Sequence, residues 1–154
     1  DPGKGEKGFA ARALLGWASR LHEIGISIAQ GAFHKHSAYI LANADMPGFS
    51  RQEQSRLASL VLAQRGRLAK AKDALAGDSD LAALACCLRV AVILYRSRRN
   101  LKLPAVRAHR KGKGFRLSIA PGWLGDHGLV QVALEGERRE WESVGYAFEA
   151  VEEA

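Results

Sequence analysis

Two neighbouring stretches, 21-LHEIGISI-28 and 34-HKHSAYIL-41, hold three of the chain's five histidines around the carboxylate of Glu23. Gly31 lies between the two stretches and is suited to ending a helix. The histidines are therefore expected to flank a tight corner between two helices. This corner decides how the N-terminal part of the chain folds.

The segments on either side of the corner have helical periodicity. Apolar residues recur at steps of three and four over residues 9–28, which predicts one amphipathic helix. His22 and Glu23 should lie in the C-terminal half of that helix. A shorter helix is expected over residues 34–44, before the turn 45-DMPG-48.

Further helices are predicted downstream of this turn. Ser50 and Glu53 have the spacing of a capping box, so a third helix should begin there and run to about Arg65. Residues 68–75 can hold another helical turn, and 77-GDSD-80 supplies a break and a new N-terminal cap. The N-terminal part of the chain is therefore expected to be helical throughout.

The segment 81–95 is apolar on nearly every face, which a helix tolerates only when it is packed on all sides. We expect it to be the central helix. Arg89 is its single charge and needs a partner if it is buried, because an unpaired interior charge is very costly. Glu23 is a candidate for that partner.

The pattern changes after Pro104, where apolar and polar residues alternate on both sides of the turn 111-KGKG-114 and predict a β-hairpin. A helix and a last strand should follow, which makes the tail a small ββαβ unit. The expected elements are strands over residues 106–110, 115–120 and 146–152 and a helix over residues 129–143. The fold class is therefore α+β, with an all-helical part over residues 1–102 and a small α+β domain over residues 103–154.

Charge favours a polyanionic partner. The 154 residues include 23 Lys and Arg against 16 Asp and Glu, which gives a net charge of +7. Basic residues concentrate over residues 65–72, 96–102 and 107–113, whereas residues 135–153 are acidic, and this asymmetry suggests one positive face. A solvated surface that only keeps the protein soluble explains the same pattern, so charge alone does not name the polyanion.

Three features bear on cellular location. No apolar run reaches the roughly 18 residues that a membrane span needs. Cys86 and Cys87 are the only cysteines, and their adjacency disfavours a mutual disulfide and fits buried thiols in a reducing compartment. Residues 1–7 lack the apolar core of a signal peptide and look like a truncated start. A cytoplasmic protein that does not enter a membrane is expected.

The corner motif carries a family resemblance. The stretches 22-HEIG-25, 34-HKHSAYIL-41, 47-PGF-49, 88-LRVA-91 and 121-PGWL-124 together resemble the C-terminal region of the exopolyphosphatase and guanosine pentaphosphate phosphatase family. Members of that family carry two N-terminal actin-like ATPase domains, an HD-like helical domain and a small α+β domain. The resemblance implies that residues 1–102 are the HD-like domain and that the catalytic domains, with their Mg²⁺, lie outside this chain.

The same resemblance implies a function. The intact protein is expected to release terminal phosphate from inorganic polyphosphate or from guanosine pentaphosphate, and this region is expected to hold the phosphate chain, to regulate and to contribute to a homodimer. No catalytic residue and no metal ligand is expected in this chain, which alone should be inactive. The predicted anion-binding residues are Arg20, His22, His34, Lys35, His36 and Arg65, while Glu23 and Arg89 are predicted to be structural.

The sequence is also compatible with other functions. His22, Glu23, His34 and His36 can form a hydrogen-bonded cluster that only fixes the corner. A metal-dependent phosphohydrolase of the HD superfamily needs a complete ligand set, but this chain has Glu23 in place of aspartate and Val92 where the distal aspartate would stand. A nucleic-acid-binding module is disfavoured because the basic clusters lack interleaved aromatic residues.

Overall fold

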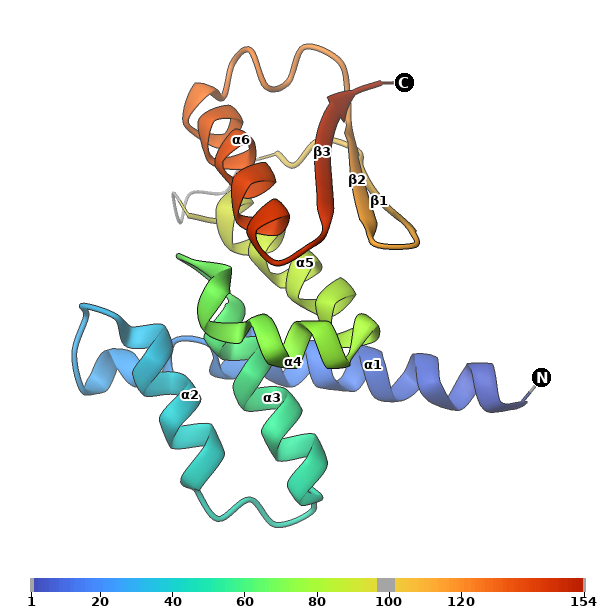
Figure 1. Cartoon of the computed structure of the whole chain (residues 1–154). Coiled ribbons are helices and arrows are strands. Elements are labelled where there is room, and N and C mark those ends of the chain that lie inside the picture. The colour runs from blue at the N-terminus through green and yellow to red at the C-terminus, as the bar shows by residue number, and fades with distance from the viewer. Residues whose placement is uncertain (1, 97–101, 154) are drawn as a thin grey trace.

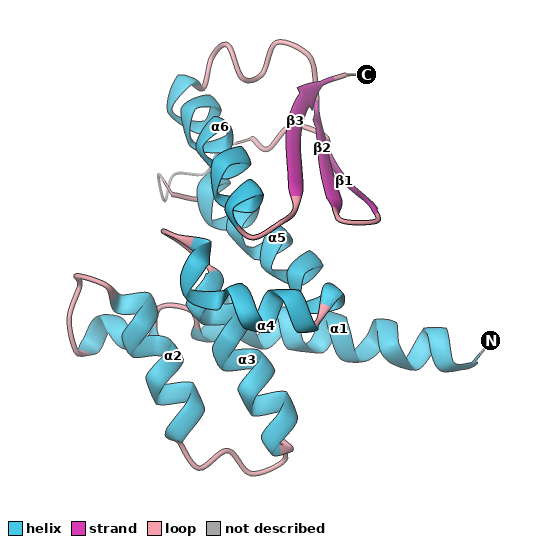
Figure 2. Ribbon diagram, viewed as in Figure 1, coloured by secondary structure: helices cyan, strands magenta, loops and turns pink. Residues whose placement is uncertain are grey.

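The computed structural model describes residues 2–96 and 102–153, with side chains of the first helix described from Ala10 onward. It is an α+β structure in which a group of helices is followed by a small sheet (Figures 1 and 2). The described elements are α1 (Pro2–Leu21), η1 (Ile24–Ser27), α2 (Phe33–Asn43), α3 (Arg51–Ala63), η2 (Leu68–Ala71), α4 (Lys72–Gly77), α5 (Ser79–Leu94), β1 (Val106–Lys111), β2 (Gly114–Ile119), α6 (Gly128–Ser143) and β3 (Ala147–Glu152). The predicted fold class is thereby confirmed, whereas the HD likeness of the helical part stays a prediction.

The first helix is shorter at its C-terminal end than the periodicity predicts. It ends at Leu21, and the 3-10 helix η1 continues the apolar pattern in a different direction. The prediction of one helix through residue 28 is therefore wrong, and His22 and Glu23 lie in the turn after α1. Close packing explains this turn, because a Cβ atom added at Gly25 would lie 2.4 Å from the carbonyl oxygen of Phe33 and 2.4 Å from the amide nitrogen of Ser37. The chain bends so that α2 can pack directly on the backbone of Gly25.

The predicted N-terminal caps are present. Ser50 and Glu53 form a capping box at the start of α3, in which the Glu53 amide donates to Ser50 Oγ and the Glu53 carboxylate accepts from the Ser50 amide. Asp78 caps α5 by accepting hydrogen bonds from the amides of Asp80 and Leu81. These side chains determine where two core helices begin.

Helix α5 is the central helix, as predicted. Half of its residues are buried, and it contacts α1, α3, α4 and α6. Its two cysteines differ, because Cys86 is buried while Cys87 is exposed, so the prediction of two buried thiols holds for only one. Burial raises the pKa of the Cys86 thiol to about 12.

The C-terminal part forms the predicted ββαβ unit. The sheet has the order β1-β2-β3, with β1 and β2 antiparallel and β2 and β3 parallel, so α6 makes the crossover connection. Phe115 stacks on Tyr146 at 5.4 Å and meets Trp141 edge-on at 4.9 Å, which joins the sheet to α6. The Tyr146 hydroxyl donates to the carbonyl of Leu75, which ties this unit to the helical part.

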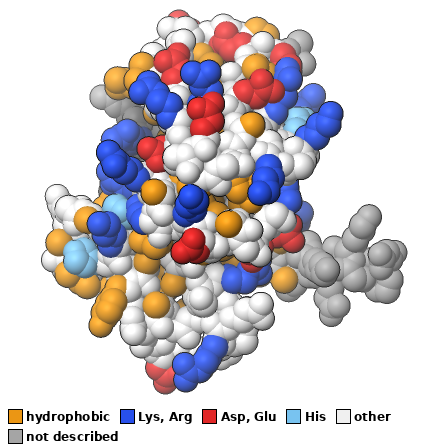
Figure 3. Space-filling model, viewed as in Figure 1, with side chains coloured by type: hydrophobic (Ala, Val, Ile, Leu, Met, Phe, Trp, Pro, Cys, Tyr) orange, Lys and Arg blue, Asp and Glu red, His pale blue; other side chains and the backbone are white. Residues whose placement is uncertain are grey.

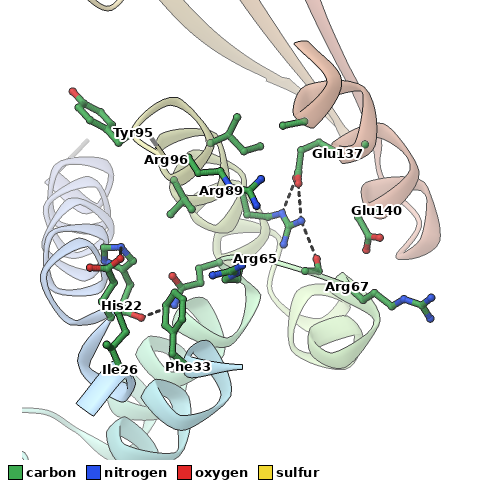
Figure 4. Close-up of a pocket in the computed structure, with 17 residues that line it drawn as sticks. His22, Ile26, Phe33, Arg65, Arg67, Arg89, Tyr95, Arg96, Glu137 and Glu140 are labelled. Atoms are coloured by element: carbon green, nitrogen blue, oxygen red, sulfur yellow. Dashed lines mark hydrogen bonds and ion pairs between the residues drawn. The ribbon is translucent and has the colours of Figure 1, made fainter. Parts of the chain in front are cut away.

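Arg89 joins the two parts of the chain in the interior. Its guanidinium donates to both carboxylate oxygens of Glu137 on α6, each at 2.6 Å, and to the carbonyls of Ala63 at 2.6 Å and Gly66 at 3.0 Å (Figure 4). The expectation that Glu23 pairs with Arg89 is therefore wrong. Glu137 lies on the buried face of α6 and meets the guanidinium with the paired geometry that a buried arginine requires.

Candidate functional site

A cleft of about 600 Å³ lies where the helical corner, the end of α3, the C-terminal half of α5 and one side of α6 meet (Figure 4). Its walls combine apolar side chains with four arginines and three glutamates. The residues that line it are His22, Glu23, Ile26, Phe33, Gln64, Arg65, Gly66, Arg67, Arg89, Val92, Ile93, Tyr95, Arg96, Ala133, Gly136, Glu137 and Glu140, and we call this space the α5–α6 cleft.

The corner positions one wall of the cleft through backbone groups. The carbonyl of His22 accepts hydrogen bonds from Ser37 Oγ at 3.0 Å and from Gln64 Nε2 at 2.6 Å. The His22 ring contacts its own helix through the carbonyl of Ser19, and its Nε2 lies 4.0 Å from the Glu23 carboxylate. The His22 carbonyl, shared by a hydroxyl and an amide, therefore holds the corner, while a structural role for the histidine cluster stays a prediction.

Three arginines of the cleft are not neutralised by ion pairs among the described residues. Arg65, Arg67 and Arg96 are exposed, and none of them forms an ion pair within the described part of the chain. Arg65 lies over the Phe33 ring at 4.9 Å, which fixes its guanidinium beside the cleft. Figure 3 shows Lys and Arg side chains gathered along the left edge, where the helical part meets α6.

The nearby acidic groups are occupied. The carboxylate of Glu137 is taken up by Arg89, and Glu140 accepts the backbone amide of Leu68 at 2.9 Å. These contacts satisfy structural donors, so they leave the exposed arginines available to an anion from solution.

Two titratable groups beside the cleft report an excess of positive charge. Burial, followed by the charges of Lys70, Arg65 and Lys35, lowers the pKa of His34 to about 4. Burial, followed by the charges of Arg89, Lys35 and Arg65, lowers the pKa of Lys70 to about 8. The Lys70 ammonium also donates to the Arg65 carbonyl at 2.6 Å. A bound anion would relieve this mutual repulsion.

The His34 ring also contains an unsatisfied polar atom. Its Nδ1 atom is buried and has no hydrogen-bond partner among the described residues. Most buried polar atoms in folded proteins have such a partner, so an orphaned nitrogen within a positive cluster is unusual. Protonated Nδ1 can donate to an anion that enters the cluster.

The predicted anion-binding residues do not all come together. His22 and Arg65 line the cleft, and His34 and Lys35 share an electrostatic environment with Arg65 and Lys70. Arg20, at the end of α1, lies over Trp17 at 5.9 Å and does not line the cleft. His36 is half-buried on α2 against Gly25 and does not line it either.

Sequence reasoning missed several residues of the site. Arg67, Lys70 and Arg96 belong to predicted basic clusters, but nothing in their spacing distinguishes them from solvated arginines and lysines. Most of the cluster over residues 96–102 lies outside the described residues. Glu137 had a usable signal, because it lies at helical spacing between the buried Leu134 and Trp141.

Metal binding finds no support in the described residues, where no group of three His, Cys, Asp or Glu side chains could hold an ion. In the same ranges no helix is long and apolar enough to span a membrane. The arrangement therefore offers cations and hydrogen-bond donors, and its chemistry is suited to holding anions.

Comparison with known proteins identifies the family. Residues 4–138 match the model of Ppx/GppA phosphatase, domain III. The chain is 36% identical over 135 residues to a guanosine-5'-triphosphate,3'-diphosphate pyrophosphatase of Pseudoalteromonas translucida (strain TAC 125), covering 86% of this chain and 27% of that protein. It is 32% identical over 138 residues to a protein of the same name from Vibrio atlanticus (strain LGP32), covering 88% of this chain and 28% of that protein. The chain therefore spans about a quarter of the length of these relatives, and it belongs to the Ppx/GppA phosphatase family as a C-terminal region of such a protein.

Proposed function

We propose that this chain is the substrate-holding region of a phosphohydrolase that releases terminal phosphate from guanosine pentaphosphate or from inorganic polyphosphate. The hydrolytic centre and its Mg²⁺ would belong to the domains outside this chain. The names of both relatives describe action on a guanosine nucleotide with a 5'-triphosphate and a 3'-diphosphate. This chain would bind the phosphate chain and would not cleave it alone.

One observation carries the proposal, the cluster of positive charge beside the α5–α6 cleft. Lys35, Arg65 and Lys70 lie close enough to lower the pKa of His34, and Lys35 and Arg65 lower that of Lys70. Like charges at such proximity cost folding free energy unless an anion binds between them. Phosphate oxygens suit these residues because arginine, lysine and imidazolium donate charge-assisted hydrogen bonds.

Dimerisation and regulation belong to the same proposal. Leu129 and Val132 are exposed on α6 at 91% and 67%, one turn apart and next to Ala133, which lines the cleft. An apolar pair of this kind is suited to contact with another domain or a second copy of the chain. The two cysteines, both unpaired, fit the reducing cytoplasm that we propose as its location.

The test is a titration of fluorescently labelled long-chain polyphosphate into the 154-residue chain at two salt concentrations, with released phosphate measured on the same samples. We expect binding that weakens steeply with salt, no phosphate release, and competition by guanosine pentaphosphate. The relative affinity of the two ligands tells which one the cleft prefers.

Matched variants locate the binding site. Arg65→Ala combined with Lys70→Met should weaken binding by about tenfold, because two charge-assisted contacts are lost. Arg51→Ala is the control, since Arg51 is exposed at the first residue of α3, whereas the cleft is lined by residues that follow the other end of that helix. Equal losses for both variants, or no binding at low salt, would overturn the proposal.

A further inference from the structure

One face of the sheet is left uncovered at strand β1. Its residues Val106, Ala108 and Arg110 pair with Ile119, Leu117 and Phe115 of β2, so the members of each pair share one face of the sheet. The three β2 residues are buried, whereas Ala108 and Arg110 are exposed and Val106 is only half-buried. The inner face of the sheet is therefore covered over β2 and uncovered at β1.

The uncovered region is an apolar groove of about 360 Å³ between α5 and the sheet. Its floor on α5 includes Ala83, Cys87 and Ala91, which recur every four residues and present small side chains. Phe115 and Leu117 of β2 form its inner wall. An ion pair between Arg110 and Asp80, at 3.1 Å, joins β1 to the start of α5 at one end. A groove of this volume can accept side chains.

The backbone of β1 offers hydrogen bonds along this groove. The hairpin closes with Lys111 opposite Gly114, so alternate residues of β1, at 107, 109 and 111, exchange hydrogen bonds with β2. The amides and carbonyls of Val106, Ala108 and Arg110 then point to the free edge. Among the described residues β1 has β2 as its single neighbour in the sheet. An extended segment could add here as a fourth strand.

Charge specifies the segment. On the opposite face of β1 from Val106, Ala108 and Arg110, the side chains are those of Arg107, His109 and Lys111. Arg116 of β2, beside His109, is already paired with Glu149 and Glu153. We propose that the free edge of β1 and the groove beneath it bind an extended acidic polypeptide segment whose apolar side chains, at every second position, enter the groove. This inference does not depend on the proposed function of the α5–α6 cleft.

Two competing explanations give different expectations. Basic residues on an edge strand often serve only to prevent pairing with other strands. That role needs no groove, whereas here the edge lies above an apolar groove floored by small side chains. A second copy of the chain is a poor occupant through its own β1, because like charges would then face each other across the new pair.

The test uses two seven-residue probes that alternate valine with glutamate or with lysine, both acetylated and amidated. Binding to the full chain is followed by amide hydrogen exchange and by alkylation of Cys87, whose exposed thiol lines the groove. We expect the acidic probe to slow exchange at the amides of Val106, Ala108 and Arg110 and to slow alkylation of Cys87. The lysine probe should do neither.

Two variants separate strand addition from simple charge attraction. Ala108→Pro removes one amide that points to the free edge and does not bond to β2, and an edge strand tolerates such a change. It should weaken the affinity for the acidic probe by about tenfold. Replacement of Arg107, His109 and Lys111 by Glu should make the chain bind the lysine probe more tightly than the acidic probe. Thermal unfolding verifies that both variants remain folded. Acidic binding that survives Ala108→Pro unchanged, or that leaves the edge amides and Cys87 unprotected, would overturn the proposal.

Discussion

Ser37 holds the backbone of Gly25 in place across the helical corner. Its Oγ accepts the Gly25 amide at 2.9 Å and donates to the His22 carbonyl at 3.0 Å, and it is fully buried. One hydroxyl thus satisfies a donor and an acceptor in the turn that ends α1. The pair explains why a glycine and a serine occur at this spacing in the two stretches that flank the corner.

Removing this hydroxyl should destabilise the fold. Ser37→Ala leaves the buried Gly25 amide without a partner, and we expect a loss of about 1–3 kcal/mol in the free energy of unfolding, measured by urea denaturation. Ser27→Ala is the control, because Ser27 Oγ donates to Ile24 within its own exposed turn. Similar losses for the two serines would contradict this account of the corner.

A methyl group at Gly25 should be costlier. The nearest atoms are backbone atoms of Phe33 and Ser37 that cannot move without shifting α2, so Gly25→Ala is expected to cost about 3 kcal/mol. In contrast, Gly16 lies in α1 with no atom within 4 Å of an added Cβ, and Gly16→Ala should stabilise by about 0.5–1 kcal/mol. We expect Gly25→Ala to lower the unfolding temperature and Gly16→Ala to raise it. An unchanged unfolding temperature for Gly25→Ala would show that the backbone of α2 can shift to accommodate the methyl group.

The buried ion pair should respond unequally to single and double changes. Arg89→Met or Glu137→Leu alone leaves a buried charge unpaired and is expected to cost about 3–5 kcal/mol. The double variant should recover part of this loss, which a double-mutant cycle from urea denaturation measures. Arg116→Ala removes exposed ion pairs, which solvent screens, and should leave the free energy of unfolding nearly unchanged. Additive single losses would argue against direct pairing.

His34 should make the protein less stable as pH falls. Its pKa in the folded state is lowered to about 4 from an ordinary value of 6.5, so the unfolded chain binds more protons between these values. The contribution of neutral His34 is complete above pH 6.5 and is lost as the pH falls from 6.5 to 4. His34→Gln should flatten the pH dependence of unfolding in this window. Inorganic pyrophosphate should raise the His34 pKa in an NMR titration, and an unchanged titration would count against an anion near this ring.

Lys70 should react with acylating reagents more readily than exposed lysines. Its pKa is lowered to about 8, so the unprotonated amine is abundant near that pH. We expect mass spectrometry after brief acylation at pH 8 to find more modification at Lys70 than at Lys113 on the hairpin. Bound polyphosphate should suppress this reaction by restoring the ammonium form. Equal modification of the two lysines would mean that burial blocks the reagent.

Local chemistry made much of the fold predictable. The capping box at Ser50, the cap at Asp78 and the hairpin turn each depend on a few neighbouring residues, and each occurs where predicted. The end of α1 was not predictable from periodicity, because the apolar pattern continues through η1. What ends the helix is close packing of α2 on Gly25, which is a tertiary contact.

The cleft was less predictable than the fold. His22 and Arg65 were expected to bind anions and both line it, but the partner of Arg89 lies 48 positions away on another helix. Hydrophobic pattern places Glu137 on the buried face of α6 but does not select its partner. The gathering of Lys35, Arg65 and Lys70 likewise depends on how α2, α3 and η2 meet.

The contacts of Arg89 also have a mechanical consequence. The guanidinium that pairs with Glu137 on α6 donates at the same time to the carbonyls of Ala63 and Gly66, on either side of Arg65. The loop that contains Arg65 is thereby connected to α6 through Arg89, and a tilt of α6 must move this loop with it. A displacement of α6 by contact with another domain would therefore move Arg65. The distances between the proposed phosphate-binding groups would change with it.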